Sequence, residues 1–108
     1  MASRLAAGML VSALIRRAEE KGGSAMVLAR GDATAGALLI QLAERGQPGP
    51  LLERRLDPHG QYRWSPTGPD ADSERADYIA RRRRGDPDLW VIELDLAGAM
   101  ELVEEVAG

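Results

Sequence analysis

Residues 81–95 read RRRRGDPDLWVIELD, and this stretch decides the fold because it joins the end of a helix to a buried strand. Gly85-Asp86-Pro87 stops the helix, since glycine ends helices readily and the residue before a proline avoids helical geometry. The apolar run that follows has the length of a strand, with Trp90, Ile92 and Leu94 on one face. This run is therefore predicted to form a strand that Trp90 anchors in the core.

Helices are predicted on both sides of this strand. Before it, Asp70, Asp72 and Ser73 are candidate N-caps for a helix that runs to about Arg84 and has only a narrow apolar stripe. After it, residues 99–106 place Ala, Leu and Val on one helical stripe and glutamates outside it. The chain therefore ends in a short amphipathic helix.

The first 65 residues predict one more helix and four strands. Apolar residues recur at spacings of four over residues 5–18, and Gly22-Gly23 ends this helix. A buried strand through residues 9–15 is the competing interpretation, because the apolar run is continuous. The predicted strands cover residues 24–30, 36–44, 51–56 and 61–65, with turns at residues 47–50 and 57–60.

Together these elements predict a single α+β domain over residues 1–108. The predicted order is α-β-β-β-β-α-β-α. We expect an antiparallel sheet of four or five strands with the helices packed mainly on one face.

The composition excludes several classes of chemistry. The chain of 108 residues has no Cys and one His, His59, so disulfides, thiolate nucleophiles and Cys or His metal clusters are set aside. An apparent calcium loop at residues 70–81 fails because its sixth position is Arg75 and its twelfth is Arg81. No metal, cofactor or catalytic residue is therefore predicted. The apolar stretch at residues 5–15 is too short for an export signal or a membrane span, which indicates a cytoplasmic protein.

Charge is segregated along the chain. Seven of the 17 acidic residues lie in residues 86–108, which contain no Lys or Arg, although the net charge of the chain is only −3. The two parts are expected to neutralise each other. The alternative is a dipolar surface that steers partners.

Four blocks of sequence resemble a bacterial family, mostly alphaproteobacterial, known as domain of unknown function 1491. These blocks are Val11-Ser12-Ala13-Leu14-Ile15-Arg16-Arg17, Arg30-Gly31-Asp32 with Ala35-Gly36-Ala37, Tyr78-Ile79-Ala80-Arg81 and Asp86-Pro87-Asp88-Leu89-Trp90-Val91-Ile92-Glu93. The resemblance covers most of residues 5–95 and implies an uncharacterised cytoplasmic domain with no activity to transfer. The chain departs from the family pattern at Arg82, Arg83 and the terminal stripe.

The arginine run is one candidate site. Arg75 together with Arg81, Arg82, Arg83 and Arg84 suggests a basic face for nucleic acid. Consecutive residues on a helix point about 100° apart, so the run cannot form one flat patch. The alternative is a solvated helix end whose arginines pair with nearby acids.

The loop after this helix is the second candidate site. Asp86 and Asp88 are placed to form a polar notch with Arg81 and Arg84 beside Trp90, which would bind a ligand or partner or serve an enzyme. The structural alternative is an Asx-turn at Asp86.

The leading functional hypothesis is a small non-catalytic interaction or adaptor domain. The stripe at residues 99–106 suggests docking on a protein partner or a second copy. Nucleic-acid binding through the arginine helix is the alternative, and an enzyme site near Asp86 and Asp88 ranks third. No membrane association is predicted.

Overall fold

The computed structural model describes residues 5–108, which form three helices and five strands in the predicted α+β order. Residues 9–15 are helical, so the competing interpretation of a buried strand is wrong. The elements are α1 (Ala7–Glu20), β1 (Ser24–Ala29), β2 (Leu38–Glu44), β3 (Gln47–Leu56), β4 (Tyr62–Thr67), α2 (Asp72–Gly85), β5 (Trp90–Asp95) and α3 (Ala99–Ala107).

The strands form one mixed sheet in the order β1-β5-β2-β3-β4. Three pairs are antiparallel as predicted, whereas β2 and β5 are parallel. The parallel pair arises because α2 carries the chain from β4 at one edge back to the centre of the sheet. Buried on both faces, β2 and β5 have near-continuous apolar runs, the pattern of strands inside a parallel sheet.

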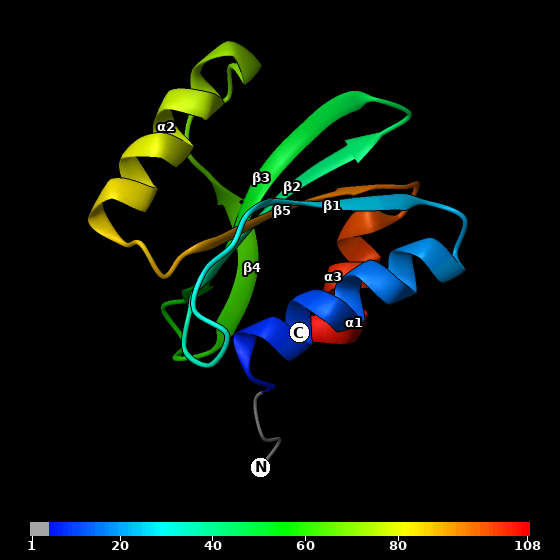
Figure 1. Cartoon of the computed structure of the whole chain (residues 1–108), viewed down its shortest axis with the longest axis horizontal. Helices are drawn as coiled ribbons and strands as arrows, with labels where there is room; N and C mark the ends of the chain where they lie inside the picture. Colours follow the sequence, from blue (N-terminus) through cyan, green and yellow to red (C-terminus); the bar gives the residue numbers. More distant parts are fainter. Residues whose placement is uncertain (1–4) are drawn as a thin grey trace.

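The helices cover the two faces of the sheet unequally, as Figure 1 shows: α1 and α3 lie on one face and α2 lies alone on the other. The larger core therefore packs α1 and α3 against the sheet, with Leu14, Ile92 and Val103 fully buried. The smaller core packs Tyr78 and Ile79 of α2 against Leu39 and other sheet residues.

The apolar stripe of α3 belongs to this larger core. Ala99, Leu102 and Val103 are buried within the chain itself, and the partly buried Val106 packs against the same core. The expectation that this stripe docks on a partner is therefore wrong, because intramolecular packing already uses it.

Two local expectations are also corrected. Residues 47–50 are not a turn but the first part of β3, which accommodates Pro48 and Pro50 because pairing with β4 begins only at Leu51. The turn is Arg45-Gly46, where both residues have positive φ.

The start of α2 also differs from its expectation. Its N-cap is Ala71, and no side chain caps the helix. Asp72 and Glu74 instead lie in the first turn, where carboxylates interact favourably with the helix dipole.

The hairpin turn at residues 57–60 has the predicted glycine geometry. Gly60 has a φ of 82°, and the Asp57 carboxylate accepts hydrogen bonds from the backbone N–H groups of His59 and Gln61. Within residues 5–108, no helix combines the length and the apolar character needed to cross a bilayer.

Candidate functional site

The inward face of α2 is polar, and this explains the arginine run. The partly buried residues of the helix are Arg75, Tyr78, Ile79, Arg82 and Arg83, which follow the spacing of one helical face. The narrow apolar stripe was expected at Ala76, Ile79, Ala80 and Arg83. Ile79 and Arg83 face the sheet, whereas the two alanines are exposed. Packing α2 on the sheet therefore requires acceptors for arginine side chains.

Glu53 of β3 is the principal acceptor. Arg82 donates from Nη1 to Glu53 Oε1 at 2.9 Å and from Nη2 to Oε2 at 2.5 Å, which makes a bidentate ion pair. Arg82 also donates to the Tyr78 hydroxyl at 2.9 Å. The hydrogen bond with Arg82 lowers the pKa of Glu53, and the same carboxylate raises the pKa of Arg82. Both groups are therefore charged at neutral pH.

Thr67 and Tyr78 close a ring of hydrogen bonds with this pair. Thr67 Oγ1 donates to Glu53 Oε1 at 3.3 Å and lies 3.1 Å from the Tyr78 hydroxyl. Either of these two hydroxyls can donate to the other. Burial acts to raise the pKa of Tyr78, but these hydrogen bonds outweigh it and lower the pKa. The ring fastens α2 to β3 and β4.

Acidification is expected to weaken this attachment. The pKa of Glu53 in the folded state lies below its ordinary value of 4.5, so the carboxylate stabilises the fold above that pH and loses this contribution as the pH falls through the folded pKa. In urea unfolding at a series of pH values, wild type should lose stability below about pH 4.5 more steeply than Glu53→Gln. Parallel stability curves for the two proteins would contradict this prediction.

Two other arginines of the predicted basic face are also held within the chain. Arg75 donates to the carbonyl oxygens of Gly49 at 2.6 Å, Pro69 at 3.2 Å and Asp70 at 3.0 Å. Arg83 donates to the carbonyl oxygens of Arg30 and Pro87. These contacts are intramolecular, and they orient the guanidinium groups toward backbone carbonyls.

Arg81 and Arg84 are exposed, so the five arginines of the predicted nucleic-acid face do not lie on one common surface. Nucleic-acid binding through them stays a prediction.

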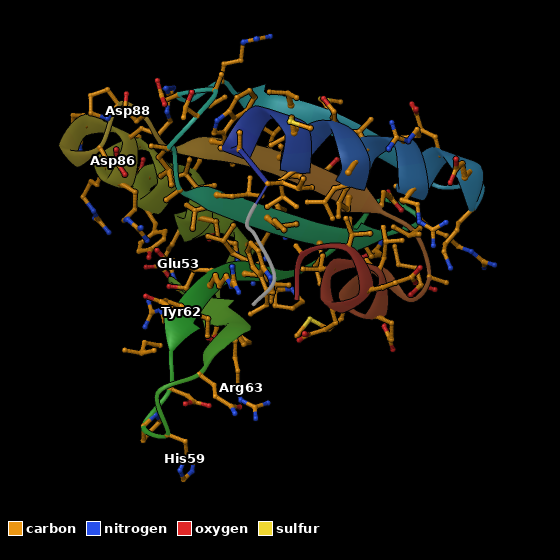
Figure 2. All side chains as sticks on the ribbon, turned by 90° about the horizontal axis from the view of Figure 1, so that it is seen from below. Glu53, His59, Tyr62, Arg63, Asp86 and Asp88 are labelled. Atoms are coloured by element: carbon orange, nitrogen blue, oxygen red, sulfur yellow. The ribbon has the colours of Figure 1, made fainter. Side chains whose placement is uncertain are left out.

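The loop between α2 and β5 has the structure expected of an Asx-turn. Asp86 Oδ1 accepts a hydrogen bond from the Asp88 backbone N–H at 3.2 Å, and Figure 2 shows both aspartates at the end of α2. None of the ion pairs of the described residues joins these aspartates to Arg81 or Arg84. A ligand site at this loop stays a prediction.

Trp90 is an anchor of the core. It is buried, its indole Nε1 donates to the Asp32 carbonyl oxygen at 2.7 Å, and the Arg30 guanidinium lies 5.5 Å from its ring centre. The Asp32 backbone N–H in turn donates to the Asp88 carbonyl oxygen at 3.0 Å. Segments 30–32 and 86–90 are therefore one packed unit, although more than 50 residues separate them in sequence.

Glycine is required where these two segments meet. A Cβ on Gly31 would lie 2.0 Å from the Asp88 carbonyl oxygen, and one on Gly36 would lie 2.3 Å from the same atom. Such distances are far inside van der Waals contact. The sequence blocks around Gly31, Gly36 and Asp88 are thus explained by packing of backbone on backbone.

A cavity of about 810 Å³ lies on the face of the sheet that α1 and α3 cover. It is bounded by the start of α1, the loop before β2, the hairpin β3–β4 and the last turn of α3. Arg54 and Tyr62 line it. His59, by contrast, is exposed at the hairpin tip (Figure 2). Within residues 5–108 no group of three or more His, Asp and Glu side chains is placed to hold a metal ion.

Comparisons with known proteins agree on one group of relatives. The family model described as "Protein of unknown function (DUF1491)" matches residues 5–104. A crystal structure of a DUF1491 family protein from Caulobacter crescentus CB15 is similar at 33% identity and a TM-score of 0.77, covering 91% of this chain and 94% of that one.

Two solution structures are also similar. An NMR structure of a DUF1491 family protein from Caulobacter crescentus CB15 matches at 35% identity and a TM-score of 0.73, with 90% and 91% of the two chains covered. A protein from A. tumefaciens matches at 31% identity and a TM-score of 0.67, with 91% and 92% covered. No curated protein matches the chain.

Proposed function

We propose that this chain, which belongs to the DUF1491 family of proteins of unknown function, is a non-catalytic cytoplasmic interaction domain that pairs with a second copy of itself through β1. The observation that carries this proposal is an apolar edge strand. Among the strands that the structure describes, β1 hydrogen-bonds only to β5. Three successive side chains on it are exposed: Met26 at 57%, Val27 at 38% and Leu28 at 48%.

The two edges of the sheet differ in how they are protected. Edge strands of monomeric proteins commonly carry charges or prolines, which discourage the addition of another strand. β4, at one edge, has Arg63 and Pro66, whereas the six residues of β1 include neither a charged residue nor a proline. A bulge between Val27 and Ala29 bends the end of β1, so pairing is expected mainly over its first four residues.

An identical strand is a suitable partner for β1. Antiparallel pairing about a two-fold axis at Met26 places Ala25 of one copy opposite Val27 of the other, on the same face of a continuous sheet. No like charges meet within the uncharged strand. Such a closed pair covers the exposed edge of both copies and ends growth of the sheet.

Sedimentation analysis of the full chain tests this proposal. Wild type is expected to sediment with twice the mass of one chain, and Met26→Lys to raise the dissociation constant about tenfold or more, because two lysines would face each other across the axis. Leu56→Lys is the matched control, since Leu56 is 59% exposed and lies on β3, toward the opposite edge. A monomeric wild type, or equal dissociation by both variants, would overturn the proposal.

A further inference from the structure

The cavity beside α1 has the size and lining of a small-molecule site. Its volume of about 810 Å³ falls within the range of roughly 300–1,000 Å³ typical of ligand pockets. Leu10, Leu38, Trp64 and Val106 supply apolar walls, and the short side chains of the loop before β2 leave the space open. An apolar body of moderate length fits such a lining.

Arg54 is the charged side chain of this cavity, whose lining also includes Gly108 at the end of the sequence. Arg54 lies on β3 directly opposite Trp64 of β4, and its guanidinium carbon is 5.2 Å from the ring centre of Tyr62. Its Nε is buried and, like that of Arg83, has no hydrogen-bond partner among residues 5–108. None of the ion pairs of the described residues includes Arg54. A permanently charged group with a buried donor that no described residue uses is suited to bind the acceptor group of a ligand in the cavity.

Glu53, the neighbour of Arg54 on β3, has the polar contacts that Arg54 lacks among the described residues. Glu53 and Arg54 are neighbours on β3, so their side chains point to opposite faces of the sheet. Glu53 has its acceptor capacity filled by Arg82 and Thr67, whereas the Arg54 guanidinium lies over the Tyr62 ring and forms no ion pair among the described residues. The fold thus completes the polar contacts of Glu53 under α2, although Arg83 Nε there has no partner among the described residues, and it leaves Arg54 Nε in the cavity in the same state.

We propose that this cavity binds a small amphiphilic carboxylate, a molecule with an apolar tail and one carboxyl group. The carboxylate accepts parallel hydrogen bonds from the Arg54 guanidinium, a geometry that the planar fork of arginine favours. The tail lies along Leu10, Leu38 and Trp64. The tail supplies most of the binding free energy through apolar burial, and Arg54 selects for the negative charge. This site is separate from β1 and does not depend on pairing of two copies.

Titration of the full chain with decanoate, followed by calorimetry and by the fluorescence of the tryptophans, tests the proposal. Decanoate is expected to bind, while decanol, which lacks the charge, and acetate, which lacks the tail, should each bind at least about tenfold more weakly. Arg54→Met should weaken decanoate binding by roughly tenfold or more and leave decanol binding unchanged. Arg54→Lys keeps the charge but loses the planar fork, so its affinity for decanoate should lie between those of wild type and Arg54→Met.

Arg55→Met is the matched control, because Arg55 lies next in β3 and on the opposite face of the sheet. Thermal unfolding of each variant shows whether it is folded. The proposal is overturned if folded wild type binds no decanoate, if decanol binds as tightly as decanoate, or if Arg54→Met and Arg55→Met lose the same affinity.

Discussion

Replacing Gly31 by alanine is expected to lower the free energy of unfolding by about 3 kcal/mol. The added Cβ would lie 2.0 Å from the Asp88 carbonyl oxygen and 2.7 Å from Trp90 Cδ1. Neither neighbour can give way cheaply. The Asp88 carbonyl accepts the Asp32 backbone N–H, and the Trp90 indole is held by its hydrogen bond to the Asp32 carbonyl. Urea unfolding of the purified variant measures the loss.

Gly85→Ala is the control for this experiment. Gly85 is the last residue of α2, and a Cβ there meets no atom within 4 Å. Alanine at this position should be neutral or should stabilise the fold by up to about 1 kcal/mol, because it restricts the unfolded chain. If Gly31→Ala were as stable as Gly85→Ala, close packing of the two segments would not be the reason for glycine at position 31.

The elements that sequence patterns predict well are those whose pattern matches their burial. The spacing of apolar residues in α1 and the alternation in β5 indicated the correct structures. The predicted end of α1 and the predicted hairpin turn are also confirmed, with positive φ at Gly22 and Gly60. The parallel pairing of β2 with β5 could not be predicted in this way. It depends on where α2 returns the chain to the sheet, which no local pattern specifies.

The arrangement under α2 was missed for a different reason. The predicted stripe of α2 contains Ala76 and Ala80 beside Ile79 and Arg83, yet both alanines are exposed. The inward face contains Arg75, Tyr78 and Arg82 in addition to Ile79 and Arg83. The polar side chains can be partly buried because the sheet and the loops supply hydrogen-bond acceptors for them. A useful signal was Tyr78 four residues before Arg82, together with a single acid, Glu53, on the face of β3 that α2 covers. Arg82 and Glu53 are 29 residues apart in the sequence, so their pairing can be recognised only once the fold is known.

The segregated charges of the chain have a similar explanation. Among the ion pairs of the described residues, only Arg17 with Glu105 joins the acidic end to the rest of the chain. Asp86 and Asp95 instead accept hydrogen bonds from backbone N–H groups in turns. Asp86 and Asp95 therefore fasten loops, and Arg82 obtains its acid from β3.

The contact between Arg82 and Glu53 is expected to be the strongest side-chain coupling between α2 and the sheet. Arg82→Met should lower the free energy of unfolding by about 2 kcal/mol, because it leaves a partly buried carboxylate with fewer donors. The side chains of Arg82 and Glu53 are 29% and 18% exposed, so the loss should be smaller than for a fully buried ion pair. Urea unfolding of Arg82→Met, Glu53→Gln and the double variant gives the coupling free energy, expected to be about 1–2 kcal/mol.

An exposed ion pair of the same chain is the control for this coupling. Arg17 is 36% exposed and pairs with Glu105, which is 53% exposed, so water already solvates both groups. Arg17→Met should therefore cost less than about 1 kcal/mol. Were the coupling at Arg82 no larger than the effect at Arg17, burial would add nothing to the contact under α2. The polar face of that helix would then be tolerated by the fold and not needed by it.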